Sequence, residues 1–155
     1  MKTHASVRGE IPYKILQGEG TMYRILLLAL LTTTSIQAQP AADTQAAQRQ
    51  ALGFLGYLDQ GRYADSYAYT GMLIRNQADR SSFAQQIEKA RAGVGAMQQR
   101  ALTDATYSTA VPGAPQGQYV VLHYHTSFAN RPDATETLTL DFAKDYWRLA
   151  GYYIR

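Results

Sequence analysis

Two histidines that stand two residues apart, His123 and His125, are the pair whose spacing most readily suggests chemistry. Residues two apart in a strand point to the same face, so both imidazoles could bind one metal ion. Asp141 could share that face. A metal site needs three or four ligands, however, and no spacing indicates a further one. The simpler interpretation is a pair of surface histidines, and we predict no metal and no cofactor.

Glu136 is the carboxylate best placed for acid–base chemistry. Alternation along its stretch puts it on the same side as Leu138 and Leu140, the side expected to be buried. Burial can raise the pKa of a carboxylate enough for it to act as a general base. The alternative is a glutamate paired with Arg131 or another arginine. We favour this ion pair, because buried carboxylates are rarely left unpaired.

The sequence contains no other recognisable catalytic pattern. Its serines show no spacing typical of a Ser–His–acid arrangement, and there is no phosphate-binding loop or dinucleotide fingerprint. We therefore expect a protein that is not an enzyme.

Tyrosine is unusually frequent, with 12 in the chain. Tyrosines can line a ligand cavity between helices and a sheet, although a packed aromatic core is the commoner arrangement. The candidate ligand-binding residues are four tyrosines and the glutamate: Tyr57, Tyr67, Tyr124, Glu136 and Tyr153.

Helices in the first half must position these residues. Asp43 or Thr44 can cap a helix that runs to about Gln60, with apolar residues at helical spacing. A second, short helix is predicted over residues 63–72, and Ser82 opens a third with a capping-box pattern. Basic residues in this part are interpreted as a solvated face: Arg75, Arg80, Lys89 and Arg91.

From Arg100 the sequence period changes to two, which is typical of strands. Four strands are predicted, over residues 100–111, 118–128, 134–142 and 146–155. The short connections favour an antiparallel meander, in which consecutive strands are neighbours. The predicted fold class is therefore α+β, with N-terminal helices packed on a curved four-stranded sheet.

Alternation divides this sheet into a face covered by the helices and an open face. We assign these residues to the covered face: Val120, Leu122, Tyr124, Leu138, Leu140, Phe142, Trp147, Leu149 and Tyr153. The candidate interface residues lie on the open face: Tyr119, Val121, His123, His125, Arg148, Tyr152 and Ile154. A partly apolar, aromatic open face is typical of a partner surface, so we expect a homodimer or another protein partner there.

The N-terminal part predicts export. From Met22, a short basic start, an apolar run over residues 25–31 and small residues ending at Ala38 form a secretory signal peptide. The apolar run is shorter than the roughly 20 residues that span a membrane, so membrane contact is expected only during export. We expect the mature protein in the periplasm or secreted. Residues 1–21 are interpreted as a wrongly annotated extension, with Met22 as the true initiator, or as a disordered one. Residues 39–43 are predicted to be a linker, and residues 44–155 a single domain.

The charge of the chain does not favour nucleic acid as a partner. The formal net charge is +3 and the pI about 9.2. Removing residues 1–38 removes four cationic and two acidic residues and leaves +1, so the basic pI belongs partly to the leader. The absence of cysteine excludes disulfides and thiolate metal sites.

The order of motifs resembles a known bacterial family. The helix with its Leu58–Tyr63 bend, the further helices and a meander ending in Trp-Arg-x-Ala-Gly-Tyr-x-Ile resemble the cystatin-like, nuclear-transport-factor-2-like cone. Several stretches look like the family called domain of unknown function 4019: 112–115, 117–121, 126–130, 136–140 and 147–155. The resemblance covers about Gln48 to Arg155. It implies a curved sheet wrapped around helices, often exported, with no established activity and no catalytic residues to transfer.

Together these observations predict a small exported binding or interaction module, homodimeric through the open sheet face. The alternative is a cone-pocket protein that binds, or acts on, a small apolar ligand with Glu136 at the pocket wall. A filled core would favour the first interpretation, and a continuous cavity beside Glu136 would favour the second.

Overall fold

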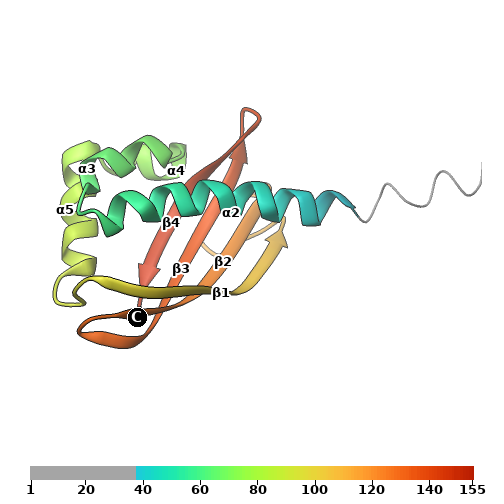
Figure 1. Cartoon of the computed structure of the whole chain (residues 1–155). Helices are drawn as coiled ribbons and strands as arrows, with labels where there is room; N and C mark the ends of the chain where they lie inside the picture. The colour runs from blue at the N-terminus through green and yellow to red at the C-terminus, as the bar shows by residue number, and fades with distance from the viewer. Residues whose placement is uncertain (1–37) are drawn as a thin grey trace, which may run out of the picture. The chain divides into compact units, whose positions relative to one another are not determined.

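The computed structural model describes residues 38–155, in which helices are followed by a four-stranded antiparallel sheet (Figure 1). The helices are α2 (Ala38–Asp59), α3 (Tyr63–Ser66), the 3₁₀ helix η2 (Tyr67–Tyr69), α4 (Met72–Arg75) and α5 (Arg80–Arg91). The strands are β1 (Met97–Ser108), β2 (Tyr119–Phe128), β3 (Arg131–Ala143) and β4 (Tyr146–Ile154), in the spatial order β1-β2-β3-β4. This confirms the predicted α+β class and the meander. The predicted extension and most of the predicted signal peptide lie outside the described residues.

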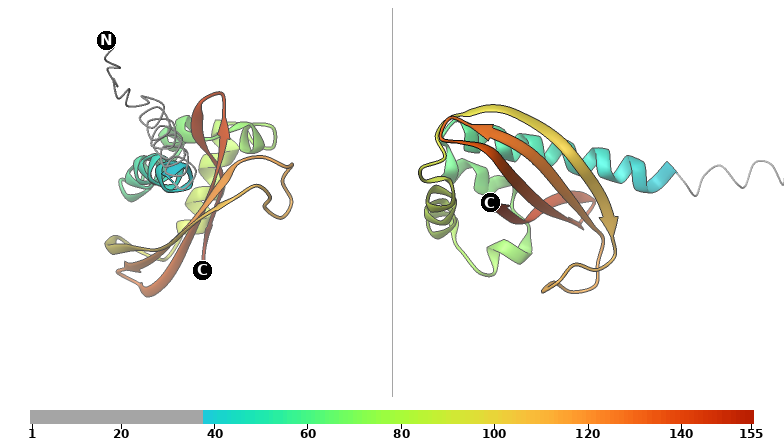
Figure 2. Two further views of the ribbon diagram at one scale, coloured as in Figure 1. Left: turned by 90° about the vertical axis from the view of Figure 1, so that its right-hand side faces the viewer. Right: turned by 90° about the horizontal axis from the view of Figure 1, so that it is seen from below.

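The core lies between α2 and one face of the sheet. The sheet is twisted and curved, and α2 runs across it (Figure 2). Helix α2 buries one apolar stripe, consisting of Ala47, Ala51, Phe54, Leu55 and Leu58. The sheet contributes Val120, Leu122, Tyr124, Leu138, Leu140, Trp147 and Leu149, all assigned correctly to the covered face. Phe142 lies at the margin of this core, 38% exposed, with its ring 5.2 Å from that of Trp147.

Two helices begin earlier than predicted. Helix α2 starts at Ala38, so the residues expected to form a linker are helical. Pro40 permits this, because an N–H in the first turn of a helix has no partner within that helix. Helix α5 starts at Arg80, and its cap is Asp79, whose carboxylate accepts a hydrogen bond from Ser82 N–H at 2.8 Å. Within residues 38–155, no helix is long and apolar enough to cross a membrane.

The second helix is broken at Thr70 and Gly71. These two residues are extended, and Gly71 N–H donates to Leu149 O at 2.8 Å, which places the segment along the outer edge of β4. A Cβ atom on Gly71 would lie only 2.6 Å from Asp141 Oδ1, so the close approach requires glycine. This contact directs α4 away from α3 and toward the hairpin that joins β3 and β4.

Strand β4 contains an extra residue. Thr139 is opposite Gly151 and Leu140 is opposite Leu149, so Ala150 has no partner of its own in β3. Such a bulge reverses the face to which the following side chains point. The alternation predicted from the sequence therefore holds only as far as Leu149.

The bulge overturns the predicted faces of three residues. Tyr152 and Ile154, predicted on the open face, point to the covered face. Tyr152 packs against Phe54 with ring centroids 5.6 Å apart, and Ile154 packs against the buried cluster that contains Phe128. Tyr153, predicted in the core, is 58% exposed.

Candidate functional site

Glu136 lies at the centre of a buried network of charges. Arg100 Nε donates to Glu136 Oε2 at 2.7 Å, and Thr126 Oγ1 donates to the same oxygen at 2.6 Å. The Tyr152 hydroxyl donates to Oε1 at 2.6 Å. The preferred interpretation of Glu136 as a paired carboxylate is therefore confirmed, although its partner is Arg100 and not Arg131.

A second carboxylate completes the network from the end of α2. Asp59 accepts two hydrogen bonds from Arg100, at 2.7 and 3.0 Å, and one from Arg91 at 2.8 Å. Arg91 is also 3.7 Å from Glu136 and lies over the ring of Phe128. The two carboxylates thus balance the two guanidinium groups. The prediction that Arg91 belongs to a solvated face was wrong, since its side chain is only 4% exposed.

The ionisation of this network follows from burial and pairing. Burial raises the pKa of Asp59, but the hydrogen bonds and charges of Arg100 and Arg91 outweigh burial and hold that pKa below its ordinary value. Burial likewise lowers the pKa of Arg100, while Asp59 and Glu136 outweigh it and raise that pKa. Burial, reinforced by the charge of Glu136, raises the pKa of Tyr152 far above its usual range. Burial also raises the pKa of Tyr124, to about 12.

This geometry favours a structural role for Glu136. A general base needs an oxygen that can accept a proton from a substrate, but both oxygens of Glu136 already accept hydrogen bonds from protein donors. Glu136 is fully buried, and it is absent from the linings of four surface pockets within residues 38–155.

The candidate ligand-binding tyrosines do not meet in one cavity. Tyr124 is buried in the core beside the charge network. Tyr67 donates its hydroxyl to Ala78 O at 3.0 Å, and Tyr57 packs against Tyr69 with ring centroids 5.8 Å apart. Tyr153 is exposed on the opposite face of the sheet. Of these four candidate tyrosines, only Tyr124 lies near Glu136.

The two histidines lie on the open face but bind different partners. His123 Nδ1 is 3.0 Å from Thr137 Oγ1, and His125 Nε2 is 2.9 Å from Asp133 Oδ1. Among the described residues, no group of three or more His, Cys, Asp or Glu side chains could hold a metal ion.

The remaining candidate interface residues have different surroundings. Tyr119 is buried, and its hydroxyl donates to Pro115 O at 2.7 Å in the loop between β1 and β2. Val121 borders a hollow of about 380 Å³ on the open face, between that loop and α4. Arg148 belongs to another pocket.

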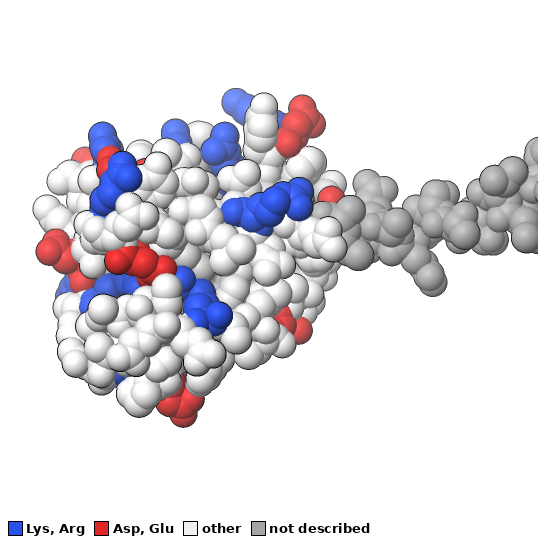
Figure 3. Space-filling model, viewed as in Figure 1, with Lys and Arg blue, Asp and Glu red and all other residues white. Residues whose placement is uncertain are grey.

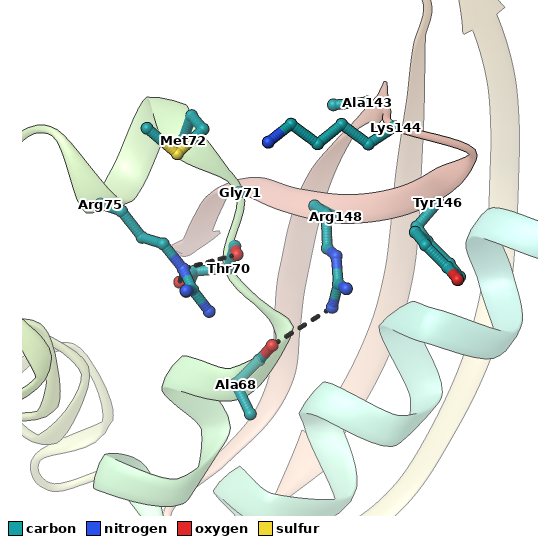
Figure 4. A pocket seen from close by; sticks show the side chains of 9 residues that line it. All are labelled: Ala68, Thr70, Gly71, Met72, Arg75, Ala143, Lys144, Tyr146 and Arg148. Atoms are coloured by element: carbon teal, nitrogen blue, oxygen red, sulfur yellow. Dashed lines mark hydrogen bonds between the residues drawn. The ribbon is translucent and has the colours of Figure 1, made fainter.

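That pocket, hereafter the cationic pocket, lies between α4 and the β3–β4 hairpin and has a volume of about 310 Å³ (Figure 4). Its lining residues are Ala68, Thr70, Gly71, Met72, Arg75, Ala143, Lys144, Tyr146 and Arg148. Three of these residues, Arg75, Lys144 and Arg148, are cationic; in Figure 4 the Lys144 side chain extends toward Met72, and the two guanidinium groups are directed toward the segment that carries Ala68 and Thr70. The three cationic residues come from α4, the hairpin turn and β4, so the tertiary fold brings them together.

Backbone carbonyls hold the two arginines in place. Arg75 donates from Nε to Thr70 O at 3.0 Å and from Nη2 to Tyr67 O at 3.3 Å. Arg148 donates from Nη1 to Ala68 O at 3.3 Å, and its guanidinium lies 5.3 Å from the centre of the Tyr146 ring. Lys144 and Asp145 form the hairpin turn with positive φ angles of 53° and 67°. Such a turn costs free energy in residues other than glycine, and it fixes the position from which Lys144 extends.

The three cations of the pocket lack acidic partners. None of the ion pairs within residues 38–155 includes Arg75, Lys144 or Arg148, and the pocket lining contains no Asp or Glu. Arg62, Arg80, Arg91 and Arg100, by contrast, all pair with carboxylates. Figure 3 shows several Lys and Arg side chains along the upper part of the molecule, toward the hairpin.

One carboxylate lies beside the pocket. Asp141 is opposite Arg148 in the sheet and approaches Gly71. Burial raises the pKa of Asp141, and the charge of Arg148 opposes that rise. The sequence predicted none of this pocket, because Arg75 and Lys144 lie far apart in the chain and neither belongs to a recognisable motif.

The comparisons with known proteins agree with the resemblance seen in the motifs. Residues 50–152 match the family model described as Protein of unknown function (DUF4019), which covers well over half of the chain. None of the curated proteins compared with the chain matches it. The helices, the meander sheet and this match together establish that the chain belongs to the DUF4019 family.

Proposed function

We propose that the protein is an exported binding module that takes a small anionic group into the cationic pocket, and that it is not an enzyme. The observation that carries this proposal is the position of Arg75, Lys144 and Arg148 around one hollow without a carboxylate in its lining. Export rests on the signal-peptide pattern over residues 22–38.

The physical basis is the unbalanced charge of the pocket. Neighbouring cations repel one another, and the repulsion is relieved when an anion binds between them. Because carbonyl groups already fix the two guanidinium groups, little side-chain freedom remains to be lost on binding. Arg75 Nη1 and Arg148 Nη2 make no hydrogen bond within the described residues and can donate to a ligand.

A titration followed by NMR tests the proposal. We expect inorganic phosphate, added to the ¹⁵N-labelled protein at neutral pH, to shift the backbone amide signals of Gly71, Met72 and Lys144 in a saturable manner. Arg148→Gln and Lys144→Gln should weaken this binding, because each removes a cation from the pocket.

Lys89→Gln is the matched control. Lys89 is an exposed residue of α5 outside the cationic pocket, and its replacement changes the net charge by the same amount. Binding that is unchanged in Lys144→Gln, or equally weakened in Lys89→Gln, would rule out the cationic pocket as the site.

A second candidate function is self-association through the open sheet face. The hollow beside Val121 favours it, since Thr139, Ala150 and the loop residues Val111 and Pro112 also line this hollow.

A further inference from the structure

We infer that the cationic pocket selects a doubly charged phosphomonoester group over singly charged carboxylates and phosphodiesters. This inference rests on the proposed function, because it names the chemical class of the anion that the same pocket binds. Three observations carry it: the charge count, the directions of the donors, and the size and lining of the pocket.

The charge count favours a dianion. Arg75, Lys144 and Arg148 bring three positive charges to the lining of the pocket, and no carboxylate lines it, although Asp141 and Asp145 lie beside it. A cationic site attracts a doubly charged anion more strongly than a singly charged one. A phosphomonoester carries close to two negative charges above its second pKa of about 6, whereas a carboxylate or phosphodiester carries one.

The donor directions favour a tetrahedral group. A planar carboxylate is best bound by a single guanidinium fork, with two parallel hydrogen bonds. The cations that line the cationic pocket belong to three different elements, α4, the hairpin turn and β4, so they do not form a single fork (Figure 4). A phosphomonoester presents three terminal oxygens that point in different directions, so each cation can meet its own oxygen.

The size and lining favour a small organic phosphate or a headgroup. The volume of about 310 Å³ lies at the lower end of the range for small-molecule pockets, roughly 300–1,000 Å³. Met72 and Tyr146 are both more than half exposed at the pocket, where they can contact the organic part of the ligand. The same phosphomonoester chemistry occurs in soluble metabolites and in phosphatidic acid at a membrane surface.

The pH dependence distinguishes a dianion from a monoanion. The charged and titratable groups around the pocket are Arg75 from α4, Lys144 and Asp145 from the turn, Arg148 and Tyr146 from β4, and Asp141 from β3. Protonating Asp141 at acid pH would remove a negative charge and strengthen the binding of any anion. The second ionisation of a phosphomonoester acts in the opposite direction, because the ligand gains charge as the pH rises.

Calorimetric titrations at pH 5.0 and pH 7.5 with two probes test the inference. We expect sn-glycerol 3-phosphate to bind about tenfold more tightly at pH 7.5, following its second ionisation. Dimethyl phosphate is a monoanion at both pH values. At pH 7.5 it should bind more weakly than glycerol 3-phosphate, and its affinity should not increase as the pH rises. Lys144→Gln should weaken glycerol 3-phosphate binding by about tenfold, while Lys89→Gln should leave it unchanged.

Vesicles distinguish the two sources of the group. Co-sedimentation with vesicles that contain phosphatidic acid, a monoester, is compared with vesicles that contain the same fraction of phosphatidylglycerol, a diester. Selective binding to phosphatidic acid without binding to glycerol 3-phosphate would assign the ligand to a lipid headgroup and would still support the inference. Binding to glycerol 3-phosphate without selective binding to vesicles that contain phosphatidic acid would assign the ligand to a soluble phosphate.

Two outcomes contradict the inference in different ways. If dimethyl phosphate or acetate binds the pocket as tightly as glycerol 3-phosphate, with no strengthening toward pH 7.5, the inference is wrong and the proposed anion-binding function stands. If none of the probes binds in solution or on vesicles, both the inference and the proposed function are wrong.

Discussion

At the residue scale, arginine has two distinct roles in this protein. Arg91 and Arg100 are buried and paired with Asp59 and Glu136, whereas Arg148 is anchored by a backbone carbonyl and forms no ion pair within residues 38–155. A buried ion pair gives little net stability, but removing one partner leaves an unpaired buried charge, which is expensive. The first role therefore neutralises the buried carboxylates Asp59 and Glu136, and the second leaves charge available for a ligand.

Asp59→Asn tests the structural role at this scale. Because the folded-state pKa of Asp59 lies below its ordinary value of 3.8, the carboxylate contributes stability above that value and loses it as the pH falls through the folded-state pKa. We expect Asp59→Asn to lower the free energy of unfolding by about 2 kcal/mol at pH 7. The difference from the wild type should shrink below about pH 4.

Urea unfolding across this pH range measures the effect. Asp65→Asn is the control, because Asp65 pairs with Arg62 and Arg80 on the surface, where ion pairs contribute only about 0–1 kcal/mol. An equal loss in both variants, or a loss in Asp59→Asn that does not change with pH, would contradict the assignment.

At the element scale, the bulge in β4 decides which side chains reach the network. Without the extra residue at Ala150, Tyr152 would point to the open face and could not donate to Glu136. The adjoining Gly151 is consistent with a bulge, since an isolated glycine within a strand pattern often marks one. The bulge also explains why strict alternation assigned Trp147 and Leu149 correctly and Tyr152 wrongly.

A pair of tyrosine variants tests this register. Tyr152→Phe removes a hydrogen bond to a buried carboxylate and should cost about 1.5–3 kcal/mol of unfolding free energy. Tyr153→Phe removes an exposed hydroxyl and should change stability by less than about 0.5 kcal/mol. Thermal or urea melts of the two variants provide the comparison, and equal effects would mean that the bulge is misplaced.

Much of the architecture could be predicted from the sequence, because each helix and strand carries its own period. One face of a helix is indicated by the spacing of Phe54, Leu55 and Leu58, and one face of a strand by Leu138 and Leu140. This spacing is a local property that does not depend on the rest of the chain. The cationic pocket and the Asp59 network could not be predicted in this way. Their members come from separate elements, and only the break at Gly71 and the hairpin turn bring them together.

At the scale of the whole molecule, the distribution of charge matters more than its total. After residue 38 the formal net charge is only +1. Three carboxylates nevertheless form ion pairs with four arginines: Asp65 pairs with Arg62 and Arg80, Asp59 with Arg91 and Arg100, and Glu136 with Arg100. The three cations of the pocket take part in none of these ion pairs, so a nearly neutral domain can present a positive hollow.

The open face is the other surface on which the whole molecule can act. The bulge removes Tyr152 and Ile154 from this face, so it is less apolar than alternation alone predicts. The bulge also adds the exposed Tyr153 to this face. Other apolar residues of the face line the hollow beside Val121, where α4 and the loop between β1 and β2 form the walls. We propose that a second copy of the chain binds at this hollow, since a symmetric copy is the commonest partner.

Sedimentation of the protein at neutral pH over a wide concentration range tests self-association. The wild type should dimerise, and Val121→Asp should remain monomeric, because a carboxylate in the hollow would lose its hydration on association. Ala114→Asp places the same charge in the loop wall without altering the sheet, so it separates loss of association from loss of folding. Thr135→Asp, on the same face but outside the hollow, should still dimerise. A wild type that stays monomeric at high concentration would exclude the homodimer and leave the cationic pocket as the functional surface proposed for this domain.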